Sequence, residues 1–285
     1  MLIAQISDLH VRPRGKPAYR VSETNMMAER AVDALVALTP RPDLVVITGD
    51  MTDCGLREEY EQLRAILSRL RIPTFMVPGN HDRRETFREV FHEHPAMPEG
   101  FVQFTIEDGP VRLVGLDTLV PGQSHGALCD RRLAFLDEAL GRRGDKPAIV
   151  FMHHPPFVCG IRHMDDIRLL DGAERLAEIV SRHPQVERIL CGHHHRPIQT
   201  RFAGTIASIA PSVAHQVALD ILDDREGALV FEPPAYQLHL FTPEMGLVSH
   251  TAFVERFPGP FPFVLDAEYP GGSLPNAASE DRPLR

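Results

Sequence analysis

The chain is poor in cysteine and has no long apolar run. Its 285 residues include four cysteines, and no two of them form a Cys-x-x-Cys pair. A chain of this length does not depend on disulfides for stability, so we expect mostly free thiols in a reducing compartment. No apolar stretch approaches the 18 residues of a membrane span. The first residues lack the basic segment of a signal peptide. The sequence therefore favours a cytoplasmic protein without a membrane partner.

Positive charge is also scarce. Thirty Lys and Arg stand against 39 Asp and Glu, which gives a formal net charge of −9. An acidic protein repels a long polyanion outside its binding site, so a nucleic-acid polymer is disfavoured as a partner. A small anionic substrate needs only a locally positive pocket, and bound metal ions can supply one. Hydrophobic residues make up 43% of the chain, enough for the core of one α/β domain with two sheets.

Strands and helices alternate in the first 80 residues. Apolar strands are predicted at residues 2–6, 43–48 and 74–77, while residues 24–38 and 57–70 place apolar side chains at helical spacing. Strand, helix, strand, helix, strand is the order of a parallel α/β unit. This part of the chain is therefore predicted to form a parallel sheet.

The later part of the chain changes character after residue 198. Before that point we predict a hairpin joining residues 101–106 to 111–116, helices at 130–140 and 172–182, and strands at 148–151 and 187–191. After it, short strands follow one another, and we interpret them as a second sheet packed on the first: 205–209, 213–219, 229–231, 237–241 and 247–253. Residues 258–285, rich in Pro, Gly and Ser, are predicted to be an arm or a tail.

Five short polar motifs follow predicted strands. In chain order they are Asp8-Leu9-His10, Gly49-Asp50, Gly79-Asn80-His81-Asp82, Met152-His153-His154-Pro155 and Gly192-His193-His194-His195. Together they offer enough His, Asp and Asn side chains for two metal ions about 3.5–4 Å apart, the usual spacing in two-metal hydrolases. Any one motif could be structural, but five at strand ends in this order point to a metal centre.

The first motifs leave some roles open. Asp8 and His10 lie two residues apart at a strand end and are expected to reach one cation, although a loop Asp and a surface His would look the same. Gly49 allows a sharp turn, which makes Asp50 our candidate for a carboxylate that bridges two metals; a helix cap is the alternative. Asn80 offers a neutral amide oxygen.

The residues after Asn80 suggest proton chemistry. His81 is expected beside the metals without binding them, where an imidazole can donate to a phosphoryl oxygen or to a leaving alkoxide. Asp82 could fix the tautomer of His81, or it could cap the next helix.

The histidine-rich motifs offer more nitrogens than two metals need. At most one of the adjacent His153 and His154 is expected to bind a given metal. His193 and His195, two residues apart, are expected to converge, with His194 facing away as a solvated or backbone-bonded side chain. His215 is a candidate for the pocket, and most of the other histidines are expected at the surface: His92, His94, His163, His183, His239 and His250.

The motifs resemble those of the calcineurin-like metallophosphoesterase superfamily, D-x-H, G-D, G-N-H-[DE], H and G-H-x-H, and residues 8–195 match every element. The chain is similar to class III cyclic-nucleotide phosphodiesterases and more closely to the bacterial glycerophosphodiesterase branch. That second similarity lies in Asp8-Leu9-His10, Cys54-Gly55, Met152-His153-His154-Pro155-Pro156, Cys191-Gly192-His193 and His215-Gln216. The resemblance implies a four-layer α/β/β/α sandwich of two mixed sheets, with a catalytic domain over residues 1–257.

The resemblance also implies the ligand sets. The first metal would take Asp8, His10, Asp50 and His195, and the second would take Asp50, Asn80, His153 and His193. His153 is preferred to His154 because the family's ligand is the His two residues before the Pro. Asp50 and His81 would be catalytic, and the substrate would contact Tyr19, Asn80, His81 and His215. The family accepts Fe, Mn, Zn or Co, in agreement with mixed O and N ligands. The branch forms homo-oligomers through its C-terminal part, which makes residues 198–257 candidates for an interface.

The predicted activity is hydrolysis of a small phosphodiester, a 3',5'-cyclic nucleotide or a glycerophosphodiester, by a metal-activated hydroxide. The motifs contain no Ser, Thr or Cys nucleophile, so no covalent intermediate is expected. A phosphomonoesterase on the same metal site is the alternative; it would need a further cationic contact, for which Arg20 and Arg162 are candidates. A metal-free scaffold of the same fold would have lost ligands, and here every ligand position is filled.

Overall fold

A computed structural model describes residues 1–95, 100–142, 145–222 and 225–261. The chain divides into two units, residues 1–255 and 256–285. Of the second unit only residues 256–261 are described, and they contain no helix or strand. Most of the predicted arm, 258–285, lies outside the described residues. No helix in the described parts of the chain combines the length and the apolar character needed to cross a bilayer. All four cysteines are free thiols, as predicted.

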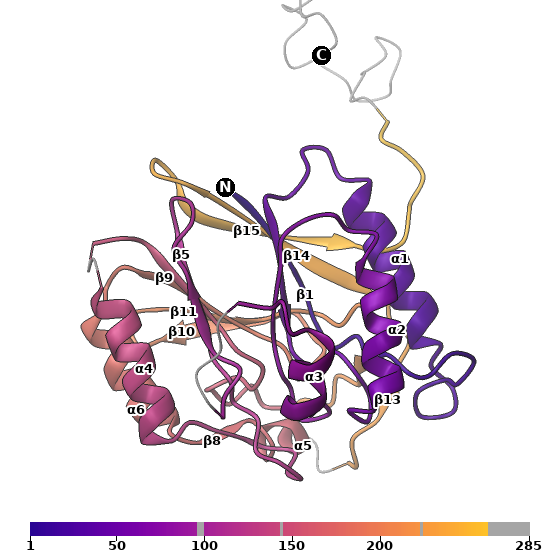
Figure 1. The fold of residues 1–285 in the computed structure, drawn as a ribbon, viewed down its shortest axis with the longest axis horizontal. Coiled ribbons are helices and arrows are strands. Elements are labelled where there is room, and N and C mark those ends of the chain that lie inside the picture. Colours follow the sequence, from indigo (N-terminus) through magenta and orange to yellow (C-terminus); the bar gives the residue numbers. More distant parts are fainter. Residues whose placement is uncertain (96–99, 143–144, 223–224, 262–285) are drawn as a thin grey trace, which may run out of the picture. The chain divides into compact units, whose positions relative to one another are not determined.

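The first unit alternates strands and helices through most of its length (Figure 1). The strands are β1 (Leu2–Ile6), β2 (Leu44–Thr48), β3 (Thr74–Val77), β4 (Phe104–Ile106), β5 (Arg112–Gly115), β6 (Gly126–Ala127), β7 (Ala148–Phe151), β8 (Leu169–Asp171), β9 (Val186–Cys191), β10 (Ile198–Phe202), β11 (Thr205–Ile209), β12 (Gln216–Val217), β13 (Leu229–Val230), β14 (Ala235–Thr242) and β15 (Gly246–Phe253). The helices are α1 (Thr24–Val36), α2 (Arg57–Leu67), α3 (Arg84–Val90), α4 (Asp130–Gly141), α5 (Arg162–Asp165) and α6 (Ala173–Arg182).

Two mixed sheets form the centre of the unit. The first sheet has the order β15-β14-β1-β2-β3 and the second β10-β11-β9-β7-β5-β4. In the first, β1, β2 and β3 run parallel while β14 joins β1 antiparallel. In the second, β5, β7, β9 and β11 are parallel and the two edge strands, β4 and β10, are antiparallel to their neighbours. Two further two-stranded pairs, β12–β13 and β6–β8, lie outside these sheets.

Three apolar layers separate four structural layers, which confirms the predicted α/β/β/α sandwich. In Figure 1, α1 and α2 lie on one side and α4 and α6 on the other, with the sheets between them. Alternation along β1 shows how the layers arise: Ala4 and Ile6 pack with α1 and α2, while Ile3 packs between the sheets. Successive strand residues point to opposite faces, so one strand contributes to two layers. The third layer joins the second sheet to α4 and α6.

The predicted assignment of the late strands to one separate sheet was wrong. β10 and β11 extend the second sheet, whereas β14 and β15 extend the first, and β12 and β13 pair only with each other. The second sheet is instead built mainly on β5, β7 and β9. Hydrophobic alternation indicates which face of a strand is buried, but it does not indicate which strand lies alongside. The predicted domain boundary at residue 257 stays a prediction.

Candidate metal centre

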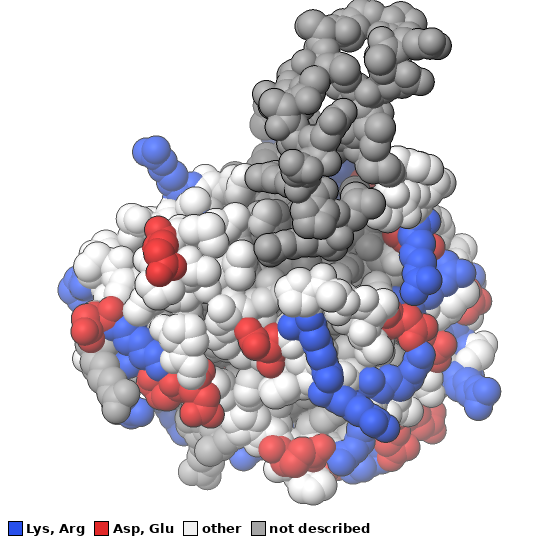
Figure 2. Space-filling view, turned by 90° about the horizontal axis from the view of Figure 1, so that it is seen from above, with Lys and Arg blue, Asp and Glu red and all other residues white. Residues whose placement is uncertain are grey.

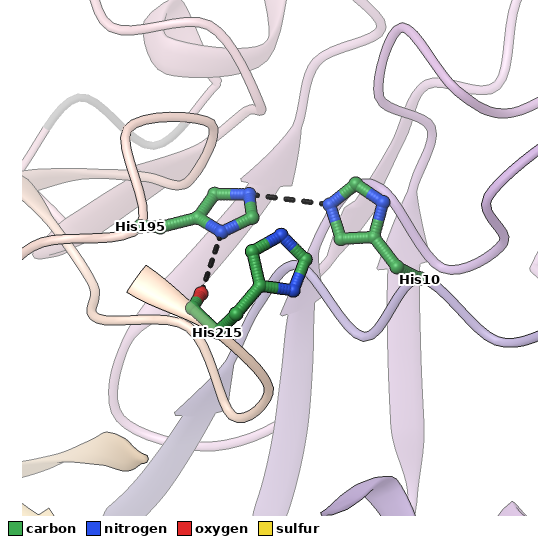
Figure 3. A group of neighbouring side chains, drawn as sticks. All are labelled: His10, His195 and His215. Carbon is green, nitrogen blue, oxygen red and sulfur yellow. Dashed lines mark hydrogen bonds between the residues drawn. The ribbon is translucent and has the colours of Figure 1, made fainter. Parts of the chain in front are cut away.

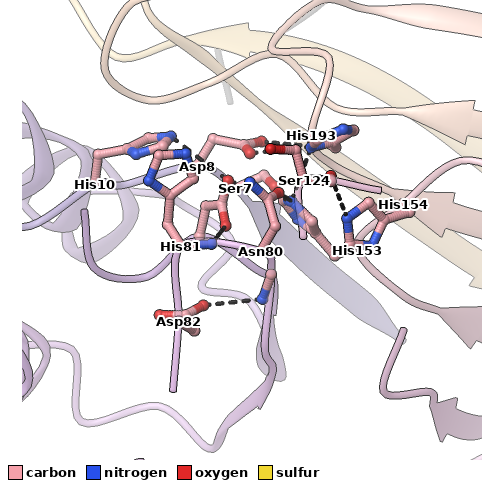
Figure 4. Close-up of polar contacts among 12 residues, drawn as sticks. Ser7, Asp8, His10, Asn80, His81, Asp82, Ser124, His153, His154 and His193 are labelled. Atoms are coloured by element: carbon pink, nitrogen blue, oxygen red, sulfur yellow. Dashed lines mark hydrogen bonds and ion pairs between the residues drawn. The ribbon is translucent and has the colours of Figure 1, made fainter. Parts of the chain in front are cut away.

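The motif residues gather where β1, β2, β3, β7 and β9 end (Figure 4). Backbone hydrogen bonds hold neighbouring loops in register: Asp8 N–H donates to Gly49 O at 3.1 Å, His10 N–H to Asp50 O at 2.9 Å, and Gly192 N–H to His153 O at 3.0 Å. The carboxyl ends of parallel strands meet at one edge of a sheet, and loops at such edges often carry binding sites. Here that edge brings motifs from both sheets together.

Several motif residues hold an unusual backbone conformation. Asp8, His10, Asp50, His193 and His195 all have positive φ values, between 46° and 73°. A Cβ atom makes this left-handed region unfavourable, although Asp and His enter it more readily than most residues. Strained backbone conformations concentrated in one place indicate a functional site, because they do not stabilise the fold.

Glycines make room for the ligand side chains. A Cβ atom on Gly49 would overlap the ring of His153, and a Cβ atom on Gly79 would overlap the carboxylate of Asp50. Gly49 also has a φ of +93°. Close packing therefore requires glycine at both positions, and at Gly49 the backbone conformation requires it as well.

Asp8, His10, Asp50 and His195 form one group of ligand atoms that all lie within 4.8 Å of one another. The Nε2 atoms of His10 and His195 are 3.2 Å apart, and His195 Nε2 is 3.4 Å from Asp8 Oδ1. These side chains are buried. Asp8 and His10 reach one position, as their spacing predicted.

A second group surrounds His153. Its Nε2 atom lies 3.1 Å from His193 Nδ1, 3.0 Å from Asn80 Oδ1 and 3.3 Å from Asp50 Oδ2. The same Asp50 oxygen is 3.8 Å from His10 Nε2 in the first group. One carboxylate oxygen thus lies between the two groups.

The tautomers in the first group leave lone pairs facing each other (Figure 3). His195 Nδ1 donates to the backbone oxygen of His215 at 2.8 Å, and His10 Nδ1 lies 3.3 Å from a carboxylate oxygen of Asp53. Each Nδ1 therefore carries the ring hydrogen, and each Nε2 of the neutral ring is a bare acceptor. Two bare nitrogens at 3.2 Å repel unless a cation lies between them.

The second group repeats this arrangement. His153 Nδ1 donates to Thr48 O at 2.7 Å, and His193 Nε2 donates to Ile167 O at 3.0 Å. The remaining nitrogens, which face each other, are bare acceptors when the rings are neutral. Two nitrogens that bind one metal at about 2.0–2.1 Å lie roughly 3.0–3.4 Å apart. The donor set and its spacing therefore fit a metal ion in each group.

The pKa values follow the same geometry. Burial lowers the pKa of His153, but the charge and hydrogen bond of Asp50 outweigh it and raise the value to about 9. In the metal-free protein a proton thus takes the position of the cation. Burial raises the pKa of Asp8 to about 6, with His153 and His10 opposing the shift. Burial also raises the pKa of Asp50, but His153 and His81 more than offset this and hold it well below its usual range.

His81 is held beside the two groups and outside them. Its Nδ1 donates to Asp53 O at 2.7 Å, and its backbone N–H donates to Asp50 Oδ1 at 2.9 Å. The ring lines the cavity above the metal groups. The predicted roles of Asp82 were both wrong. It does not set the tautomer of His81, because the carbonyl of Asp53 does so, and no side-chain hydrogen bond caps α3.

Asp82 instead ties two loops together. Its buried carboxylate accepts backbone N–H groups of Met51, Thr52 and Gly79 and the hydroxyl groups of Thr52 and Tyr60, at 2.9–3.1 Å. Its two oxygens bond the loop after β2 to the loop after β3, which are the loops that carry Asp50 and Asn80. Figure 4 shows Asp82 beneath the ligand groups.

Some predictions about the histidine-rich motifs need correction. His193 and His195 do not converge on one partner: His193 contacts His153, and His195 contacts His10. His194 is fully buried rather than solvated. His154 is close to the second group, but both of its nitrogens have protein partners, Thr118 Oγ1 at 2.8 Å and Ser124 O at 3.2 Å.

Two histidines that were expected at the surface are buried. His94 and His239 are 8% and 0% exposed. Burial lowers the pKa of His94 to about 4 and of His239 to about 3. Residues 237–241 were predicted as a strand, but the polar side chain of His239 was placed on its outer face; in the structure His239 lies inside β14 and faces the layer between the sheets.

A cavity of about 300 Å³ opens over the two groups. One wall is polar and contains Tyr19, His81 and His215. The tyrosine and His215 rings meet edge to face, with centroids 5.3 Å apart. Apolar lining comes from residues in and just after α5 and from the strand pair β12–β13 with the residue before β13: Met164, Ile167, Val217, Ala228 and Leu229. No Lys or Arg occurs among the described residues that line this cavity.

Sequence reasoning missed several supporting groups. Asp53 stands three residues after Asp50, and a carboxylate so close to a predicted ligand was a usable signal. The backbone oxygens of Thr48, Ile167 and His215, which set the ring tautomers, give no such signal because every residue has a carbonyl. The apolar wall was also missed, since ordinary core residues form it.

Known proteins share both the sequence and the fold. Residues 1–197 match the calcineurin-like phosphoesterase family. A probable glycerophosphodiester phosphodiesterase GpdQ of Arcobacter nitrofigilis is 40% identical over 264 residues, which cover 92% of this chain and 97% of that protein. A probable cyclic nucleotide phosphodiesterase of Rhodopseudomonas palustris is 36% identical, covering 83% and 86%. A dimetal phosphatase from Danio rerio shares the fold, with a TM-score of 0.62, 15% identity and coverage of 90% and 99%. The chain belongs to the calcineurin-like phosphoesterase family.

Proposed function

We propose that the protein is a binuclear metal-dependent phosphodiesterase that hydrolyses small phosphodiesters. The observation that carries this proposal is the pair of histidine contacts at 3.2 and 3.1 Å, in which ring nitrogens face each other on either side of Asp50. Asp8, His10, Asp50 and His195 would hold one metal. Asp50, Asn80, His153 and His193 would hold the other, with Asp50 as the shared ligand.

The ligand types favour borderline metals. Imidazole nitrogens mixed with carboxylate and amide oxygens suit Fe, Mn, Zn or Co better than Mg or Ca. Bound there, two such ions would polarise the phosphate oxygens and lower the pKa of a coordinated water towards about 7, which provides hydroxide at neutral pH.

The other residues of the site orient the substrate and handle charge. His81 presents Nε2 to the cavity because Nδ1 is tied to Asp53 O. In its protonated form it donates to a phosphoryl oxygen or to the leaving alkoxide. Tyr19 and His215 lie on the same side of the cavity and are the proposed substrate contacts, together with Asn80 and His81.

The charge of the cavity favours a diester over a monoester. A phosphate monoester carries one more negative charge and gains from an additional cationic side chain. Neither Arg20 nor Arg162 is among the described residues that line the cavity. On the face shown in Figure 2, Lys and Arg are interspersed with Asp and Glu, so that face offers no broad basic surface for a nucleic-acid polymer either.

The relatives suggest two substrate classes. Glycerophosphodiesters and cyclic nucleotides are the substrates in the names of the related proteins. The metal groups would serve both, because both substrates are phosphate diesters. The apolar wall near Ile167, Val217 and Leu229 suits the planar base of a nucleotide, whereas the Tyr19 and His215 side suits hydroxyl groups.

Paired assays test the proposal. The protein reconstituted with Mn or with Zn is expected to turn over bis(p-nitrophenyl) phosphate faster than p-nitrophenyl phosphate. Faster turnover of the monoester would instead indicate a phosphomonoesterase that uses the same site. A panel of cyclic AMP, cyclic GMP, glycerophosphocholine and glycerophosphoethanolamine then ranks the natural classes.

Homo-oligomerisation through residues 198–257 stays a prediction. β15 is an edge strand of the first sheet, and an edge strand offers unpaired backbone groups to another copy of the chain. Light scattering during gel filtration measures the mass of the particle and distinguishes a monomer from an oligomer.

A further inference from the structure

A chain of polar side chains runs through the apolar layer between the two sheets and ends at the metal groups. Arg188 Nη1 donates to Ser249 Oγ at 2.8 Å, and Ser249 Oγ lies 2.7 Å from His239 Nδ1. His239 Nε2 lies 3.0 Å from Gln5 Oε1. Gln5 Nε2 donates to Thr48 Oγ1 at 3.0 Å. The chain thus crosses from β9 and β15 to β14, β1 and β2.

The directions of the hydrogen bonds from Arg188 to Thr48 are determined. Gln5 Nε2 also donates to the backbone oxygen of Cys191 at 3.0 Å, so its NH2 group must face β9 and its oxygen must face His239. His239 Nε2 must then carry the ring hydrogen, which leaves Nδ1 to accept the hydroxyl hydrogen of Ser249. Ser249 in turn accepts from Arg188, which can only donate. All donors therefore point towards the metal groups.

The last links reach two proposed ligands. Thr48 Oγ1 donates to Ser7 Oγ at 2.8 Å. The Ser7 hydroxyl faces two acceptors: the backbone oxygen of Thr48 at 3.2 Å, and the carboxylate of Asp8, whose pKa it lowers through a hydrogen bond. The backbone oxygen of Thr48 accepts the ring hydrogen of His153 at 2.7 Å. Ser7 Oγ, Thr48 O and Asp8 Oδ2 all pack around the position where Gly192 lacks a Cβ atom. Thr48 is thus the branch point between the first and the second metal group.

Stability alone gives little reason for this chain. Ser7, Gln5, Thr48 and His239 are fully buried beside the apolar residues of the inter-sheet layer. Burying polar groups costs free energy that their hydrogen bonds barely repay, and well-packed apolar side chains would serve the core as well or better. Hydrogen bonds aligned in one direction polarise one another, so a chain of this kind strengthens its last donors.

We propose that Gln5 and His239 are positioning residues for the metal centre. Through Thr48 and Ser7 they orient the Asp8 carboxylate and the His153 ring. The aligned hydrogen bonds that start at Arg188 also direct donor hydrogens towards the negatively charged ligands. The inference rests on the proposed function, because it takes Asp8 and His153 to be ligands. Outer partners that orient ligands commonly change metal affinity by about 10–100-fold when they are removed.

The tautomer of His239 provides a test that needs no metal. In the metal-free wild-type protein labelled with 15N-histidine, long-range 1H–15N spectra are expected to show His239 as the neutral Nε2–H form between pH 6 and 8. The neutral state agrees with burial, which with the nearby Arg188 lowers its pKa to about 3. An Nδ1–H form or a cationic ring would reverse the chain at Gln5 and overturn the proposal.

Metal affinity provides the second test. Mn2+ binding, followed by the electron paramagnetic resonance signal of the free ion, is expected to weaken about tenfold in His239→Leu. Phe241→Leu is the matched control, because Phe241 is buried in the same strand and the same inter-sheet layer but outside the polar chain. Its affinity is expected to stay within about twofold of the wild type.

The outcomes separate the two proposals. Wild-type protein that binds no Mn2+ would refute the metal centre itself. If the wild type binds Mn2+, two results would refute the positioning role. One is that His239→Leu binds Mn2+ as tightly as the wild type, and the other is that Phe241→Leu is weakened as much as His239→Leu. Should His239→Leu fail to fold, Ser249→Ala removes an outer link of the chain, and it is expected to weaken Mn2+ binding and to shift the His153 15N resonances. An unchanged Ser249→Ala protein in both measurements would also overturn the proposal.

Discussion

The buried carboxylate of Asp82 accepts the hydroxyl hydrogen of Tyr60 at 3.0 Å. The same carboxylate accepts bonds from Met51, Thr52 and Gly79, so it joins the loop that carries Asp50 to the loop that carries Asn80. Both of these loops supply proposed ligands of the second metal. The distance between two ligands therefore depends on an acidic residue that binds neither metal nor substrate.

Asp82→Asn tests this dependence. An asparagine of the same shape has one acceptor oxygen in place of two, and its NH2 group faces donors. We expect a loss of roughly 3 kcal/mol in the free energy of unfolding, measured in urea, because a buried donor left without an acceptor costs about 1–3 kcal/mol. Phosphodiesterase kcat/KM should fall with it. Tyr60→Phe removes one donor to Asp82 and the acceptor of the part-buried Arg83 N–H, so it should cost about 1–2 kcal/mol, less than Asp82→Asn. Equal losses in the two variants would contradict this account.

His81→Asn should separate catalysis from metal binding. His81 lies beside the ligand groups and touches the cavity, but its ring is not within the Asp8, His10, Asp50 and His195 group. We expect kcat on bis(p-nitrophenyl) phosphate to fall about 10²-fold, while the metal content by elemental analysis stays at the wild-type value. Loss of a metal ion along with activity would instead make His81 a ligand.

The types of ligand and their places at strand ends could be predicted from the sequence. Buried strands such as residues 44–48 leave an apolar signature, and a following Gly49-Asp50 marks a sharp turn with a carboxylate above the sheet edge. The pairing of ligands could not be predicted from spacing. Asp8 and His10 reach one group, whereas His193 and His195, with the same spacing and the same left-handed backbones, contact different histidines.

Long-range support is the least visible part of the site. Gln5 and His239 are 234 residues apart and contact each other only because β14 pairs with β1. In the sequence, His239 lies in a plain run of strand residues, so a polar side chain there suggests the outer face. Strand order, which decides what such a residue meets, depends on the whole topology and not on local pattern.

Metal binding should release protons at neutral pH. The pKa of His153 is raised to about 9 in the metal-free protein, since the charge of Asp50 outweighs the effect of burial. At pH 7 the ring is therefore protonated, and a metal must displace that proton. Mn2+ affinity should rise by about tenfold per pH unit for each proton released and level off above pH 9. Calorimetric titrations in buffers of different ionisation enthalpy count the protons; a count of zero at pH 7 would rule this out.

Gly49→Ala should abolish metal binding at the second group. The added Cβ atom would overlap the His153 ring, and the φ of +93° adds backbone strain. Gly204→Ala is a matched control, because Gly204 has a φ of +92° but open space around its missing Cβ. Both variants should lose about 1 kcal/mol or more through strain. Only Gly49→Ala should lose one metal per chain in elemental analysis, and equal metal content in the two would show that the ring contact is unimportant.

His94 should contribute to acid sensitivity. Burial lowers its pKa to about 4, with Glu93 opposing the shift slightly, whereas an unfolded chain has the ordinary value of 6.5. A depressed folded-state pKa gives stability that is fully present above pH 6.5 and is lost as the pH falls towards 4. The loss amounts to roughly 3 kcal/mol over that window.

Urea unfolding of His94→Leu should show a shallower fall in stability between pH 6.5 and 4. The variant is nevertheless expected to be less stable at pH 7, because Met76 N–H loses its acceptor. His92→Gln, an exposed position two residues away, should keep the wild-type slope. If the free energy of unfolding falls equally steeply with pH in the wild type and in His94→Leu, other buried groups, such as His239, account for the loss of stability in acid.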